Sequence, residues 1–93
     1  MPEDFLRGRN LEAVAKDIAD GYVFVSPMYF KKFERETLQK LHVAISRVMI
    51  LIRNEKFPAG NFEAIKLRNM RLARLNNAIT VMKYFAKERR WVL

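Results

Sequence analysis

The sequence predicts an all-α fold: a long antiparallel helical hairpin, preceded by a short helix, that assembles as a homo-oligomer of the four-helix-bundle type. Two long stretches, residues 27–56 and 62–90, carry apolar side chains at helical spacing. One short segment with helix breakers, residues 57–61, separates them. Both stretches are apolar on more than one side, which favours association between chains. At 93 residues, the chain suits a single domain over residues 1–93.

A short helix is predicted over residues 10–20. Asn10 is placed to cap it, because an asparagine side chain accepts a hydrogen bond from a free backbone N–H of the first turn. Apolar residues recur at helical spacing from Leu11 to Ile18, and Gly21 is placed to end the helix.

An extended connector is predicted over residues 22–26, "YVFVS", which are rich in β-branched and aromatic types. We expect it to lie on the core, and the sequence leaves open whether it pairs as a strand with its counterpart in another chain. Ser26 and Pro27 then start the first long helix, since serine caps and proline at the first position loses no hydrogen bond.

The two long helices are predicted over residues 27–56 and 62–90. Pro58 and Gly60 break the pattern between them, and Asn61 is placed to cap the second helix. At about 1.5 Å per residue each helix would be about 45 Å long, so two matched rods joined by a short loop form an antiparallel hairpin.

The apolar positions of both helices exceed what a hairpin can bury. In the first helix one stripe is formed by Phe30, Leu38, Leu41, Ile45, Val48 and Ile52. Val43 and Ile50 point nearly the opposite way, and the second helix has two apolar sides. A dimer of hairpins is the simplest way to cover them, and a dimer is the favoured oligomer. The competing arrangement is a monomer in which residues 1–25 wrap back over these surfaces.

Eight residues are candidates for the oligomer interface: Val43, Ile50, Leu67, Asn69, Met70, Asn76, Val81 and Phe85. Asn69 and Asn76 lie beside an apolar stripe, where polar residues fix register and oligomer state. A position at the solvent boundary explains these two asparagines equally well.

Positive charge is the main chemical feature of the chain. The formal net charge is +8, and it increases towards the C-terminal two-thirds, so acidic molecules are attracted there. The candidate contacts for an anion or an acidic partner are Lys31, Lys32, Arg35, Arg68, Arg71 and Arg74. We interpret "KLRNMRLARLNN", residues 66–77, as a packing helix with basic edges, because leucine and methionine border the arginines. A phosphate-binding role for these arginines stays open.

The C-terminal "KERRWVL", residues 87–93, fits two roles. Its cations and Trp91 suit a lipid headgroup layer. The interpretation we favour is a basic helix end, whose cations suit the helix dipole, with the tryptophan capping the bundle.

Several function classes are disfavoured by composition. There is no cysteine, so disulfides and thiolate metal sites are excluded. We find no catalytic residues, no metal ligand set and no cofactor motif, and we expect no enzyme. The longest apolar run, residues 48–52, is far below the roughly 20 residues of a membrane span. The N-terminus is acidic rather than signal-like, so we expect a cytoplasmic protein.

Two functions from different classes fit these observations. The favoured one is a non-enzymatic, homo-oligomeric interaction, assembly or regulatory subunit that docks onto an acidic protein partner. The alternative is a nucleic-acid-binding module that uses the basic outer surface of the bundle.

Overall fold

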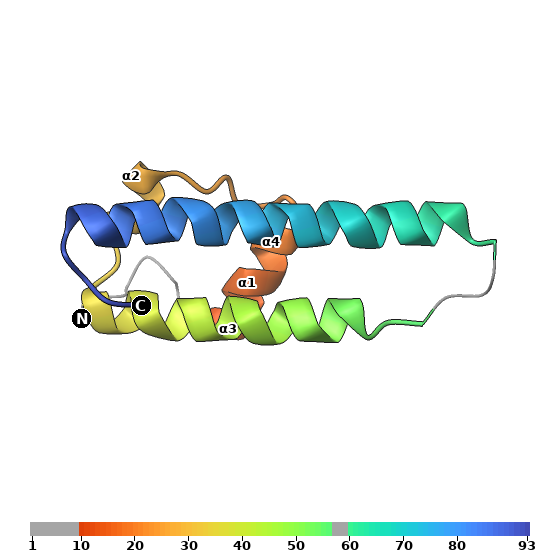
Figure 1. Cartoon of the computed structure of the whole chain (residues 1–93), viewed down its shortest axis with the longest axis horizontal. Coiled ribbons are helices and arrows are strands. Elements are labelled where there is room, and N and C mark those ends of the chain that lie inside the picture. The colour runs from red at the N-terminus through yellow and green to blue at the C-terminus, as the bar shows by residue number, and fades with distance from the viewer. Residues whose placement is uncertain (1–9, 57–59) are drawn as a thin grey trace.

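The structure is a computed structural model that describes residues 10–56 and 60–93. Within those ranges the chain is all-α, with four helices and no strand. Helix α1 spans Leu11–Ala19, α2 spans Pro27–Phe30, α3 spans Arg35–Arg53 and α4 spans Phe62–Glu88. Helices α3 and α4 form an antiparallel hairpin, and α1 crosses it steeply near the middle (Figure 1). None of the described helices is both long and apolar enough to cross a membrane.

Helix α1 is capped at both ends by residues that the sequence indicates. The Asn10 side chain accepts a hydrogen bond of 2.7 Å from the Ala13 N–H. At the other end Gly21 has a φ of 84°, the left-handed conformation that glycine adopts without a steric penalty. The Gly21 N–H donates to Ile18 and the Tyr22 N–H donates to Asp17, which are the two hydrogen bonds of a Schellman motif. The chain therefore reverses sharply after α1.

The segment predicted as one helix over residues 27–56 is divided, and that prediction is wrong. Residues 27–30 form α2, residues 31–34 form a turn, and α3 begins at Arg35. The Ser26 side chain caps α2 by accepting from the Tyr29 N–H at 3.3 Å. The residue before α3, Glu34, makes no capping hydrogen bond with its side chain, so no local signal marks this break.

Buried aromatic side chains explain the division. Phe30 and Phe33 are 0% and 3% exposed, and their ring centroids lie 6.0 Å apart. Phe30 also packs on Phe85 of α4, with 6.0 Å between ring centroids. In Figure 1, α4 lies between α2 and α3 at this end. An unbroken helix would carry Phe30 along the axis of α3 and away from this position. Burying both rings therefore outweighs the helical hydrogen bonds lost at the turn.

The core occupies the middle of the hairpin and the end closed by α2. The stripe predicted for the first long helix is buried throughout: Phe30, Leu38, Leu41, Ile45, Val48 and Ile52 are each at most 2% exposed. In α4 the buried residues are Leu75, Ala78, Met82, Phe85 and Ala86. Asn61 caps α4 through the Ala64 N–H at 3.1 Å. The first half of α4, from Phe62 to Arg74, therefore contributes no fully buried side chain.

The connector after α1 bends at Tyr22 and Val23 and forms no strand within this chain. Its valines turn inward and its aromatic residues turn outward: Val25 is buried, whereas Tyr22 and Phe24 are 79% and 88% exposed. This alternation matches the expectation that the segment lies on the core with one side.

A substitution at Phe33 tests the role of the aromatic cluster in the helix break. Phe33→Ala should lower the free energy of unfolding by about 3 to 5 kcal/mol, since it removes a buried ring and leaves a cavity. Phe24→Ala, which removes an exposed ring, is the control and should change it by about 0.5 kcal/mol or less. Urea denaturation followed by circular dichroism measures both. Equal effects of the two changes would show that the cluster does not hold the turn.

Candidate functional site

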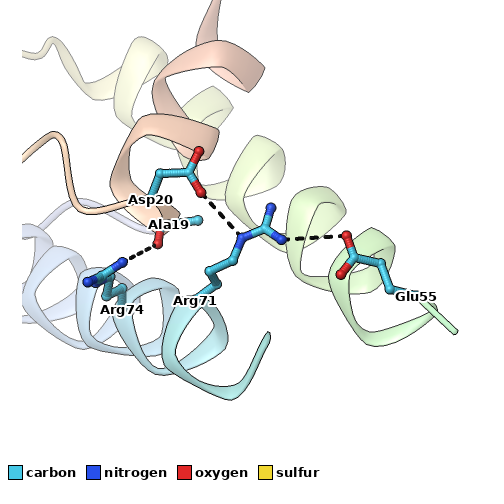
Figure 2. Close-up of polar contacts among 5 residues, drawn as sticks. All are labelled: Ala19, Asp20, Glu55, Arg71 and Arg74. Carbon is cyan, nitrogen blue, oxygen red and sulfur yellow. Dashed lines mark hydrogen bonds and ion pairs between the residues drawn. The ribbon is translucent and has the colours of Figure 1, made fainter. Parts of the chain in front are cut away.

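Arg71 joins three parts of the chain. Its Nε lies 3.3 Å from Oδ1 of Asp20, the residue that ends α1. Its Nη1 lies 3.5 Å from Oε2 of Glu55, just after α3 (Figure 2). The Arg71 side chain is 23% exposed, so water screens its attraction to the two carboxylates only in part. The geometry makes Arg71 a clamp that fixes α1 against both long helices.

Arg74, one turn further along α4, caps the end of α1. Its Nη1 donates a hydrogen bond of 3.0 Å to the Ala19 carbonyl, one of the carbonyl groups left without a helical partner (Figure 2). A cation at this end also suits the helix dipole. The guanidinium lies so close to Gly21 that a Cβ there would be 3.0 Å from Arg74 Cζ. Glycine therefore suits this position by its backbone conformation, and any larger residue would also displace the Arg74 guanidinium.

Of the other four candidate anion contacts, Arg68 lies one turn before Arg71 on α4, and three lie near α2. Arg68 is half-buried, whereas Lys31, Lys32 and Arg35 are exposed at the junction of α2 and α3. The junction lies at the end of the hairpin where α4 finishes (Figure 1), whereas Arg71 contacts Asp20 at the end of α1 and Glu55 just after α3. The structure therefore separates the six predicted residues into two groups, of which Arg71 and Arg74 are engaged with their own chain.

Most of the candidate interface residues are accessible. Val43, Ile50, Leu67 and Met70 are 48%, 54%, 55% and 42% exposed. Asn69 and Asn76 are exposed and Val81 is half-buried. Val43 and Ile50 lie on the outer side of α3, and Leu67 and Met70 lie on α4, so these pairs belong to different surfaces.

Phe85 is the exception among the candidate interface residues. It is 5% exposed and packs between Phe30 and Trp91, with ring centroids 6.0 Å and 5.8 Å away. The assignment of Phe85 to the oligomer interface is therefore corrected. Helix α2 and the segment after α4 pack over its ring and cover it. Helical projection placed Phe85 on an open side, since it contains no information about these two distant segments.

The acidic partners of the clamp were not found from the sequence. Asp20 and Glu55 are ordinary surface acids in their local contexts, and each is far from Arg71 in sequence. Only the placement of α1 across the hairpin brings them together. The one usable signal was the position of Asp20 directly before Gly21, at a predicted helix end.

No family model matches this chain, and no match to it was found among curated proteins or solved structures. Among the described residues, no group of three histidine, cysteine, aspartate or glutamate side chains could hold a metal ion.

The close approach of Arg74 to Gly21 makes their substitutions interdependent. Gly21→Ala should lower the free energy of unfolding by more than about 1 kcal/mol, because alanine is strained at positive φ and its methyl group meets the guanidinium. In an Arg74→Ala background the cost should be smaller but not zero, since the backbone strain remains. Thermal unfolding of the four proteins of this cycle measures the coupling. Strict additivity would contradict the contact.

Arg71 is expected to act on stability rather than on ligand binding. Arg71→Met keeps most of the apolar stem and removes both ion pairs, and should cost about 1 kcal/mol, or a decrease in Tm of about 4 to 8 °C. Lys66→Met, which removes an exposed cation of the same helix, should leave the Tm unchanged. Differential scanning calorimetry compares them, and equal Tm values for the two variants would refute the clamp.

Proposed function

We propose that the chain is a non-enzymatic interaction or assembly subunit that self-associates through the loop half of the hairpin. The loop half includes the first half of α4, from Phe62 to Arg74. The observation that carries this proposal is the exposure of apolar side chains on that half. Between Phe62 and Arg74 no residue is buried. Large apolar side chains nevertheless occur on several sides of this segment: Phe62, Ile65, Leu67, Met70 and Leu72.

The short reach of α1 is the cause of this exposure. Helix α1 covers only the middle of the hairpin, and the last fully buried residue towards the loop is Ile52 of α3. On the same half of the hairpin, Leu51 of α3 and Leu67 of α4 are 57% and 55% exposed. Large apolar side chains clustered on a surface favour a protein contact, and a stable dimer buries about 800 Å² on each partner. When two loop halves pair, each chain covers the exposed apolar side chains of the other.

The charge around this surface supports a protein as the partner. Asp20 and Glu55 already neutralise the charge of Arg71. Glu63 and Lys66 lie near each other at the rim of the apolar surface. A mixed-charge rim around an apolar centre is typical of protein interfaces.

Nucleic-acid binding is the alternative function. Two of the six basic residues assigned to it, Arg71 and Arg74, bind groups of their own chain. Affinity for a polynucleotide depends on the number of phosphates that cations neutralise, so this use of arginines weakens the alternative.

Self-association is tested by sedimentation velocity at about 1 to 100 µM, a range that spans the dissociation constants of moderately stable dimers. The wild-type chain should sediment as a dimer or higher oligomer. The double variant Leu67→Glu/Met70→Glu should weaken association more than tenfold, because charge is placed at the centre of the interface.

The matched control is Asn77→Glu/Thr80→Glu, which adds the same charge at exposed positions with the same spacing on α4. It should associate like the wild type. A wild-type monomer at the highest concentration, or equal weakening by both double variants, would rule out the proposed interface. Circular dichroism confirms that each variant is folded.

A further inference from the structure

The end of the molecule opposite the loop gathers basic side chains from three segments. The α2–α3 turn, the end of α4 and the residues after it meet there (Figure 1). Residues 31–36 and 83–93 together carry seven basic and three acidic side chains. Lys31 and Arg35 come from the first segment, and Lys87 and Arg90 from the second; all four are exposed. We call this surface the basic end.

An apolar groove lies within the basic end. Its volume is about 430 Å³, and it is lined by Lys83, Ala86, Lys87, Arg90, Trp91, Val92 and Leu93. The Gln39 side chain donates a hydrogen bond of 2.6 Å to the Val92 carbonyl, which holds the segment after α4 against α3. The Val92 side chain remains 80% exposed, and Met28 of α2 is 71% exposed. Apolar side chains therefore project from a surface that is otherwise cationic.

Compensation of helix dipoles explains only part of this positive charge. Lys87 lies in the last turn of α4, where a cation compensates the helix dipole. Arg35, however, is the first residue of α3, where the dipole disfavours a cation. Trp91 is held in place by Phe85 and by the Arg89 guanidinium, which lies 5.6 Å from the centroid of the tryptophan ring. Exposed cations therefore surround a preformed aromatic and aliphatic centre.

We infer that the basic end docks on an anionic phospholipid surface. Lys31, Arg35, Lys87 and Arg90 would face the lipid phosphates and carboxylates, and Trp91 and Val92 would lie at the boundary with the acyl chains. Tryptophan favours this boundary, and each basic side chain near an anionic leaflet increases binding about fivefold. This inference goes beyond the proposed function and does not depend on it, because it concerns the opposite end of the hairpin.

The geometry favours a lipid surface over a polynucleotide. A bilayer presents its charge as a plane, and the basic end is the tip of a body with extents of 46 × 27 × 19 Å. A nucleic acid presents its charge along a line, which basic residues along the length of the hairpin would match better.

The test is co-sedimentation of the full chain with vesicles of phosphatidylcholine alone or with about 30 mol % phosphatidylserine, at about 50 and 200 mM salt. The protein should bind the anionic vesicles only, and more weakly at the higher salt. Trp91 is the single tryptophan of the chain, so its fluorescence emission should shift to shorter wavelength on binding.

Two charge-matched double variants locate the contact. Lys31→Glu/Lys87→Glu alters the basic end and should reduce binding at least about tenfold. Arg53→Glu/Lys56→Glu makes the same change in net charge near the loop and should bind within about twofold of the wild type. Circular dichroism and sedimentation velocity confirm the fold and the oligomeric state of both, so a failure of self-association is seen separately.

Three results would overturn the inference. The first is the absence of binding to the anionic vesicles at the lower salt. The second is equal weakening by both double variants, which would mean attraction by net charge alone. The third is binding of a short single-stranded RNA or of polyglutamate, measured by fluorescence anisotropy or by the Trp91 emission, under conditions where vesicles are not bound. That result would assign the basic end to nucleic acid or to an acidic protein.

Discussion

The short length of α1 relative to the hairpin is the constraint from which the other features follow. Helix α1 has 9 residues and α4 has 27, which correspond to about 14 and 40 Å. A single short helix across the middle of two long ones can cover only their centre. The core therefore forms under α1 and, with the help of α2, at one end. The loop end keeps its apolar side chains exposed because, within residues 10–56 and 60–93, no further helix covers it.

The position of α1 depends on polar contacts as well as on apolar packing. Val14, Ala15, Ile18 and Ala19 are buried, but packing alone tolerates sliding of one helix on another. Arg74 fixes the end of α1 through a directional hydrogen bond to a backbone carbonyl, and Arg71 adds an ion pair with Asp20. In this basic protein, part of the positive charge therefore has an internal structural role.

The two ends of the hairpin consequently differ in chemistry. Near the loop, apolar side chains are surrounded by charges of both signs, which suits another protein surface. At the other end, the α2–α3 turn and the segment after α4 place cations around an aromatic residue. A dimer joined through its two loop halves would have a basic end at each tip. Self-association and lipid docking would therefore use opposite ends of the hairpin.

Local chemistry made part of this structure predictable from the sequence. The capping roles of Asn10, Ser26 and Asn61, the turn at Gly21 and the buried stripe of α3 follow from residues a few positions apart, and the structure shows each of them. Only the tertiary structure decided the break before Arg35, the burial of Phe85 and the partners of Arg71, because each depends on contacts between segments distant in sequence. Helical periodicity determines which side of a helix is apolar, and tertiary packing determines which neighbour covers it.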